Sequence, residues 1–91
     1  MNVRVHLYIS GKVQGVFFRD SASQMATAMD LTGYVKNLPD GRVEIVVEGE
    51  MDHVEKLVLW SHSGPPWAVV DYVERKDEVF KVEFNMFEIT R

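Results

Sequence analysis

Apolar residues recur with two different spacings along this chain of 91 residues, and the order of those spacings limits what it can fold into. From Val3 to Ile9 every second residue is apolar, which predicts a strand with one buried face. From Ala22 to Met29 the apolar residues lie three and four positions apart, which predicts an amphipathic helix that ends near Leu31. The chain is therefore expected to open with a strand followed by a helix.

The same two spacings then return. Residues 32–37 are strand-like, and the turn signal Leu38-Pro39-Asp40-Gly41 follows, with a proline that presets φ and a glycine that accepts positive φ. Residues 43–47 alternate again, so the two segments are expected to form a hairpin. A second helical pattern begins at Met51 and is expected to end before Gly64-Pro65-Pro66.

The C-terminal part predicts a fourth strand over residues 68–75 and a less regular tail. Apolar residues alternate with one parity from Phe80 to Phe84 and with the other from Phe87 to Ile89. A bend near residues 85–86, followed by a short edge strand, accounts for both parities.

The resulting order of elements is typical of the split βαβ or ferredoxin-like plan. We expect an α+β sandwich with an antiparallel sheet of four strands, a short fifth edge strand, and two helices on one face. A chain of this length is expected to form a single domain over residues 1–91.

Composition excludes several classes of protein. The chain is 46% hydrophobic and 26% charged, which is ordinary for a globular protein. It has no cysteine, so disulfides, thiol chemistry and cysteine-ligated metals are excluded. Its apolar runs are too short for a membrane span or a signal peptide, so a cytoplasmic location without membrane contact is expected. The net charge of -4 disfavours nucleic-acid binding, which depends on neutralising phosphate charge. Separately, we expect the chain to be a monomer.

The segment Ser10–Asp20 places Gly11 and Gly15 between the first strand and the first helix. Glycines let a loop curl so that successive backbone N–H groups point at one spot, and a helix N-terminus favours negative charge. Arg19, at the expected start of the helix, offers a planar fork of donors for two phosphoryl oxygens. The pattern alone leaves two interpretations open, an anion-binding loop or a plain turn with a solvated arginine.

The expected topology brings a second polar residue to this loop. In a split βαβ unit the first two strands are parallel and the third lies between them. Their ends at Gly11 and Asn37 are then at the same edge of the sheet, roughly 10 Å apart. The loop and the side chain of Asn37 can therefore share one pocket.

Residues 11–19, Gly-Lys-Val-Gln-Gly-Val-Phe-Phe-Arg, and residues 33–49, which hold Asn37 and an Asp-Gly hairpin, resemble the two signatures of the acylphosphatase family. The first family pattern is Gly-x-Val-Gln-Gly-Val-x-Phe-Arg. Residues 63–70 and 87–91 are also similar to family segments, so the resemblance covers nearly the whole chain. It implies hydrolysis of acyl phosphates to a carboxylate and inorganic phosphate, with no cofactor and no metal.

The resemblance also implies roles for individual residues. Arg19 binds the phosphoryl group together with the backbone amides of the loop, and Asn37 orients the attacking water. The implied substrate-binding residues are Gln14, Gly15, Val16, Phe17, Phe18 and Arg19, and the implied catalytic residues are Arg19 and Asn37. Three positions depart from the common family pattern, because Phe17 and Asp30 stand where glycine is frequent and Asp20 where an aromatic residue is frequent.

The chemistry of such a pocket is consistent with this substrate class. An asparagine does not titrate near pH 7, so a pocket of one arginine, backbone amides and Asn37 has no evident general base. It can hold a phosphoryl group and a water, but it can cleave only a bond whose leaving group departs unaided. A carboxylate, with a pKa of about 4, is such a leaving group.

The other polar residues are interpreted as surface groups. They are the histidines His6, His53 and His62, the carboxylates Glu44, Glu48 and Glu50, which predict a solvated strand face, and the lysines Lys12 and Lys36 near the pocket. Two other functions stay open. The sheet could bind RNA through Tyr8 and Tyr34, or the loop could bind phosphate in a regulatory domain without turning it over.

Overall fold

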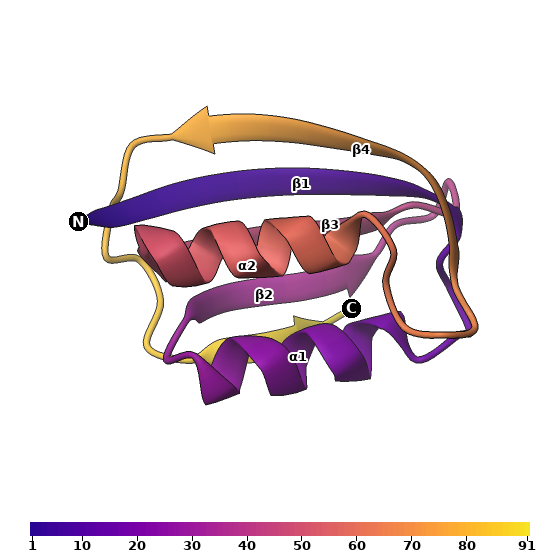
Figure 1. Ribbon diagram of the computed structural model, residues 1–91, viewed down its shortest axis with the longest axis horizontal. Coiled ribbons are helices and arrows are strands. Elements are labelled where there is room, and N and C mark those ends of the chain that lie inside the picture. Colours follow the sequence, from indigo (N-terminus) through magenta and orange to yellow (C-terminus); the bar gives the residue numbers. More distant parts are fainter.

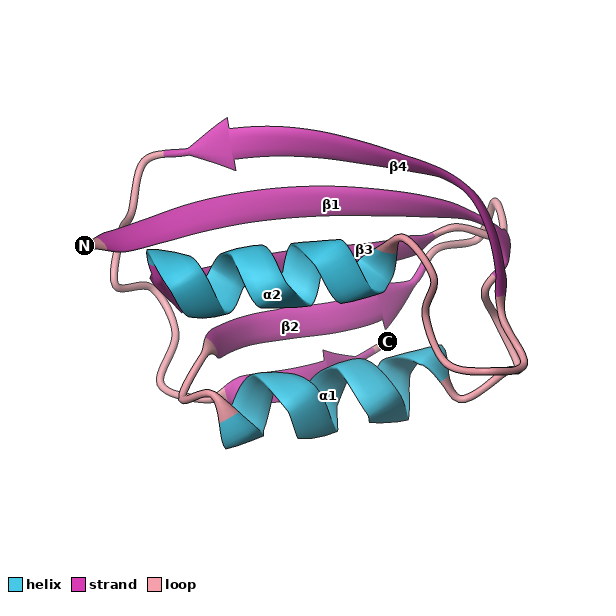
Figure 2. Ribbon diagram, in the orientation of Figure 1, coloured by secondary structure: helices cyan, strands magenta, loops and turns pink.

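The computed structural model describes residues 1–91 and contains seven regular elements. They are β1 (Asn2–Lys12), α1 (Phe18–Ala28), β2 (Thr32–Asn37), β3 (Val43–Glu50), α2 (Met51–Ser61), β4 (Val69–Glu78) and β5 (Phe87–Thr90). Both helices lie on one face of the sheet (Figures 1 and 2). The fold is therefore the predicted ferredoxin-like α+β sandwich. Neither of the two helices has the length and the apolar character that a membrane span requires.

The five strands are ordered β4-β1-β3-β2-β5 across the sheet. β3 pairs antiparallel with both β1 and β2, so β1 and β2 run parallel with β3 between them, as predicted. β5 forms the short edge strand and pairs parallel with β2. The end of β1, the start of α1 and the end of β2 consequently meet at the right-hand end of Figure 1.

The hydrophobic core lies between the sheet and the two helices. Most of the alternating residues of β1 and β3 that the sequence places inside are fully buried. Val3 of β1 and Met25 and Met29 of the first helical pattern are only partly buried. The largest contributors are Leu7, Ile9, Phe18, Ile45 and Leu57. Burying each such side chain contributes about 1.5–3 kcal/mol, so this layer holds α1 firmly on the sheet.

The first helix is shorter than predicted, because it ends at Ala28 and not near Leu31. Asp30 follows in the left-handed region with φ of 57°. The backbone N–H of Leu31 then donates to the carbonyl of Ala26 at 2.9 Å, and that of Asp30 to Thr27 at 3.2 Å. This is the Schellman ending of a helix, and it explains why glycine would be favoured at position 30.

Gly11 does not belong to the loop, and the interpretation that it helps the loop curl is wrong. β1 continues to Lys12, and Gly11 sits in the strand at a bulge, with φ of 128°. A Cβ atom on this residue would collide with the carbonyl oxygen of Val69 in β4. The glycine is needed for the close approach of two strands, and Gly15 alone provides the flexibility of the loop.

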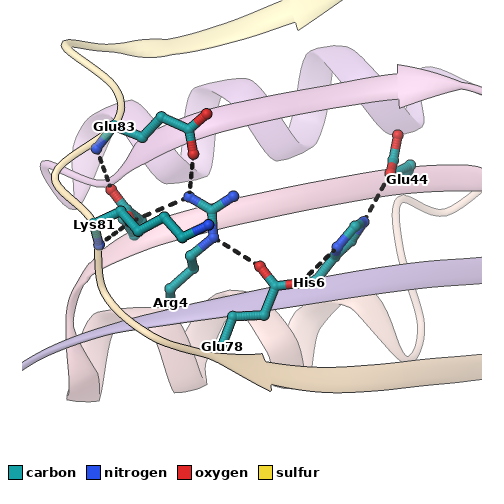
Figure 3. A network of polar contacts seen from close by, with 7 residues as sticks. Arg4, His6, Glu44, Glu78, Lys81 and Glu83 are labelled. Atoms are coloured by element: carbon teal, nitrogen blue, oxygen red, sulfur yellow. Dashed lines mark hydrogen bonds and ion pairs between the residues drawn. The ribbon is translucent and has the colours of Figure 1, made fainter.

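The tail departs from the sheet before it returns as β5. The alternating apolar residues 80–84 form no strand, because residues 79–86 lead from β4 at one edge of the sheet to β5 at the other. Along this path the segment crosses the face that the helices leave open. Glu48 of β3 accepts hydrogen bonds there from the backbone N–H groups of Lys81, at 2.8 Å, and Glu83, at 3.0 Å. Figure 3 shows Lys81 and Glu83 close to Arg4.

The prediction of a solvated strand face is wrong for Glu48, which is only 1% exposed. Its carboxylate is 3.2 Å from the guanidinium of Arg4, which also contacts Glu78 and Glu83 at 2.7 Å each. Burial raises the pKa of Glu48, but the two backbone donors and Arg4 outweigh it and hold the pKa below its ordinary value. The carboxylate fastens the crossing segment to the sheet.

Candidate active site

A cavity of about 270 Å³ lies at the end of the sheet where β1 leads into α1. The residues that line it are Val13, Gly15, Phe17, Phe18, Arg19, Asp20 and Asn37. Five of the seven residues expected at the site therefore come together, and both expected catalytic residues, Arg19 and Asn37, are among them. A cavity of this size is at the small end for ligand sites, which suits a small molecule.

The loop before α1 has the alternating backbone that turns N–H groups to one side. Gly15 and Phe17 have positive φ angles of 74° and 67°, while Val16 between them does not. Such alternation is the geometry of backbone anion-binding concavities. The backbone N–H groups from Gly15 to Asp20 donate to no acceptor within the protein, and no side chain caps the helix. These N–H groups lie at the positive end of the helix dipole and are available to bind an anion.

Arg19, in the first turn of α1, differs from most other arginines of the chain. Arg4, Arg42 and Arg75 are each held by at least one carboxylate. The guanidinium of Arg19 is half-buried, lines the cavity, and forms no hydrogen bond or ion pair with the protein. An arginine keeps its charge at any ordinary pH, so this group offers an unengaged fork of donors.

Asn37, the last residue of β2, also lines the cavity. Its Oδ1 atom is buried and has no hydrogen-bond partner, and it is the one buried side-chain polar atom of the chain in that state. Leaving a buried acceptor unpaired costs about 1–3 kcal/mol. A group that keeps such a cost in a native fold is a candidate for a functional role.

The side chains of Gln14 and Val16 do not line the cavity, although both were expected among the substrate-binding residues. The Gln14 carboxamide donates to the carbonyls of Leu38, at 2.8 Å, and Arg42, at 2.9 Å, both in the hairpin connection. Val16 is 5% exposed and belongs to the hydrophobic core. Only their backbone groups can face a ligand, and their side chains fix the loop from two directions. The sequence carried no signal for this, because backbone carbonyls accept hydrogen bonds whatever their residue type.

Phe18 fixes the start of α1 by packing into the hydrophobic core. It is buried and packs against Trp60 of α2 with ring centroids 5.0 Å apart. It also fills the space beside Gly64, where an added Cβ would meet the Phe18 ring. The loop and the first turn of the helix are therefore seated on the exit of α2, which limits their freedom to move.

Asp20 is a lining residue that the expected site did not contain. It is exposed and makes no ion pair with the neighbouring Arg19. The signal for it was its position, since residues at the N-terminus of a helix share the space around the first turn. Its negative charge lies beside the free donors of the loop.

Other polar residues considered from the sequence lie elsewhere. Lys12 and Lys36 do not line the cavity. His6 lies on the open face and contacts Glu44 at 2.7 Å and Glu78 at 3.2 Å, and His53 contacts the carbonyl of Met29 at 3.0 Å. No group of three His, Asp or Glu residues is arranged to hold a metal ion.

Fold and cavity together define a class of small ferredoxin-like domains in which a loop of free backbone N–H groups opens the first helix beside the end of β2. The family model for acylphosphatases matches residues 5–89. An acylphosphatase of Marinobacter nauticus is 52% identical over 87 residues, which cover 96% of this chain and 95% of that protein. The chain belongs to the acylphosphatase family.

Solved structures agree with this assignment. An acylphosphatase from Coxiella burnetii superposes with a TM-score of 0.92 and 42% identity, over 98% of this chain and 93% of that one. The crystal structure of an acylphosphatase from Bacillus subtilis superposes with a TM-score of 0.93 at 30% identity, over 98% of this chain and 99% of the other. The shared fold therefore covers nearly the whole of this chain.

Proposed function

We propose that this chain hydrolyses the carboxyl–phosphate bond of acyl phosphates, giving a carboxylate and inorganic phosphate. The observation that carries the proposal is the meeting of three unengaged groups at one cavity. They are the guanidinium of Arg19, the backbone N–H groups from Gly15 to Asp20, and the side chain of Asn37, whose buried Oδ1 has no hydrogen-bond partner.

The donors suit a phosphoryl group. Its oxygens carry negative charge that spreads further in the transition state, and preorganised donors aimed at such charge are a strong source of catalysis. Arg19 binds two of the oxygens through its fork, and the loop N–H groups bind the same phosphoryl from the helix side. Because these donors have no partner in the protein, no internal hydrogen bond must break when the ligand enters.

Asn37 supplies what the donors lack, an acceptor. Its Oδ1 accepts a hydrogen bond from a water molecule and aims the water oxygen at phosphorus. The new P–O bond forms as the bond to the carboxylate oxygen breaks, and the electron pair of that bond leaves with the carboxylate. One water proton goes to a phosphoryl oxygen of the substrate, since Asn37 itself takes no proton.

The sparse site sets the substrate class. No group of the cavity is placed to donate a proton to a leaving group, so the leaving group must be stable as an anion. A carboxylate, with a pKa of about 4, meets this condition, whereas an alkoxide does not. The site is consequently suited to mixed anhydrides and not to ordinary phosphate esters.

The hydrolysis of benzoyl phosphate, followed by ultraviolet absorbance, tests the proposal. We expect turnover by the wild-type chain, unchanged by a chelator and strongly reduced in an Asn37→Ala variant. Binding of inorganic phosphate without turnover would instead support a regulatory domain. We further propose that the chain is a monomer, as expected from the sequence; light scattering tests this.

A cytoplasmic location and the lack of a nucleic-acid partner stay predictions from the sequence. On the open face, Tyr8 stacks on His6 with centroids 4.6 Å apart and is covered by the Arg42 guanidinium at 4.7 Å. Tyr34 packs edge-on against Phe84 of the crossing segment at 6.0 Å. Rings engaged in this way are poor platforms for stacking RNA bases, which supports the enzyme over the RNA-binding alternative.

A further inference from the structure

We propose that this chain selects acyl phosphates whose acyl group is uncharged and apolar, with the ring of Phe17 as the wall that contacts the acyl group and Asp20 as the group that disfavours a second carboxylate. The inference rests on the proposed acylphosphatase function and concerns the other half of the substrate. It assigns roles to two side chains of the cavity that the hydrolytic step does not use.

Phe17 is an apolar side chain in an unusual position. It lines the cavity, yet it is 67% exposed, and its backbone has the left-handed φ of 67° that a residue with a Cβ adopts only under strain. Strained backbone conformations concentrate at functional sites. The ring can gain burial only by covering an apolar part of a ligand.

The flanking residues hold the backbone of Phe17 in place. Val16 and Phe18, on either side, are both buried in the core. The backbone of Phe17 is thus fixed at two points, and its side chain is left to project beside the donors that take the phosphoryl group. An aromatic or aliphatic acyl group attached to that phosphoryl would lie within reach of the ring.

The charges around the cavity point in the same direction. Arg19 is the only cationic side chain that lines it, and the phosphoryl group engages its donors. Asp20 is the only anionic one. A second carboxylate on the acyl group would find no positive partner and would meet the charge of Asp20. Specificity against charged acyl groups follows from this repulsion as much as from any attraction to apolar ones.

The first test compares kcat/KM for benzoyl phosphate with kcat/KM for acetyl phosphate in Phe17→Ala. Alanine keeps a Cβ at the strained position, so the backbone cost is matched and only the ring is lost. We expect the benzoyl-to-acetyl ratio to fall about three- to tenfold, as for the loss of one aromatic pair. Phe17→Asn, which tolerates the left-handed region, gives a second variant with the same expected fall.

Trp67→Ala is the matched control. Trp67 is an aromatic residue of similar exposure, 70%, in the connection between α2 and β4, but it does not line the cavity. Its removal should leave the benzoyl-to-acetyl ratio as in the wild type. An equal fall in Trp67→Ala would show that any exposed ring influences the ratio, and it would overturn the role of Phe17.

The second test uses succinyl phosphate, whose acyl group carries a second carboxylate. In Asp20→Asn the ratio of kcat/KM for succinyl phosphate to that for acetyl phosphate should rise about three- to fivefold, the effect of one solvated like-charge contact. The rise should shrink at high salt. An unchanged ratio at low salt contradicts the role of Asp20.

Loss of the proposed activity and loss of the proposed selectivity give different results. If the wild-type chain hydrolyses none of the three substrates, the proposed function is wrong and the inference goes with it. If the wild type hydrolyses them and the ratios in the Phe17 and Asp20 variants equal those of the wild type, only the inference is wrong. A lower benzoyl-to-acetyl ratio in the Phe17 variants together with a higher succinyl-to-acetyl ratio in Asp20→Asn supports the inference.

Discussion

The side-chain amide of Gln14 donates a hydrogen bond of 2.8 Å to the carbonyl oxygen of Leu38, the residue that follows Asn37. A second bond from the same amide reaches the carbonyl of Arg42 at 2.9 Å. One side chain thus ties the loop before α1 to the connection between β2 and β3. The position of the loop donors and the position of Asn37 are therefore coupled through Gln14.

Replacing Gln14 by Leu should loosen both sides of the cavity at once. Two hydrogen bonds are lost, although each carbonyl keeps a backbone donor, so the free energy of unfolding should fall by about 1–3 kcal/mol. The KM for benzoyl phosphate should rise as well, because loop and hairpin no longer hold one geometry. Urea unfolding and steady-state kinetics measure the two effects. Gln24→Leu, on the exposed side of α1, is the control; a loss of stability with unchanged kinetics in Gln14→Leu would argue against the coupling.

Asn37→Ala should separate catalysis from stability. We expect kcat to fall about 100- to 1,000-fold, the usual cost of removing one preorganised polar group, with phosphate affinity largely kept. Stability should stay the same or rise, because the buried Oδ1 without a partner is removed. Thermal melts and phosphate inhibition of the residual activity check both parts. A large loss of stability would mean that Asn37 is chiefly a structural residue.

Phe17 and Gly15 form a reciprocal pair for testing backbone strain in the loop. Phe17→Gly should raise the free energy of unfolding by about 1 kcal/mol, because glycine adopts a φ of 67° without penalty. Gly15→Ala should lower it by a similar ~1 kcal/mol. No other atom lies within 4 Å of the Cβ that alanine would add, so the effect is conformational and not steric. Denaturant titrations of both variants test the two signs, and equal signs would contradict the assignment.

The buried carboxylate of Glu48 makes stability depend on pH in the acid range. Its pKa is lowered in the folded state, so its contribution is fully present above the ordinary value of 4.5 and is lost as pH falls through the folded pKa. Arg4 and the hydrogen bond from His6 also lower the pKa of Glu78, which adds to the same trend. The free energy of unfolding should therefore decrease as the pH falls below about 4.5.

Glu48→Gln isolates this contribution. At neutral pH the variant should be less stable by about 1.5–3 kcal/mol, since Arg4 loses one of its charged partners. The decline in acid should be shallower than in the wild type, because one titrating group is gone. Unfolding curves recorded between neutral and acid pH measure both, and an acid decline as steep as in the wild type would exclude Glu48 as a cause.

Much of the fold was predictable because the two apolar spacings report burial directly. Strand and helix order followed from them, and the order fixes β3 between two parallel strands. That topology alone brought the end of β1 near Asn37 before any side chain was considered. Arg19 and Asn37 could be expected at one cavity for this reason, since strand order determines which ends meet.

The remaining features depend on contacts that apolar spacing does not encode. The alternation from Phe80 to Phe84 indicates that one side of the segment packs against the protein. It does not indicate whether the backbone pairs with a neighbouring strand, and here it does not. Glu48 looked solvated because carboxylates usually are, and only the register that sets it beside Arg4 shows why it is buried. The role of Gly11 in strand packing could not be predicted either, because the carbonyl of Val69 that approaches it lies far along the chain.

The central claim is that Arg19, the loop N–H groups and Asn37 face one anion. A titration of the ¹⁵N-labelled protein with inorganic phosphate, followed by NMR, tests it most directly, with Arg19→Gln as the variant and Arg75→Gln as the control. The account predicts that the backbone signals from Gly15 to Asp20 and the side-chain amide of Asn37 shift together with one Kd. That Kd should be about 10- to 100-fold weaker in Arg19→Gln and unchanged in Arg75→Gln. Shifts confined to another surface, or wild-type affinity in Arg19→Gln, would contradict the claim.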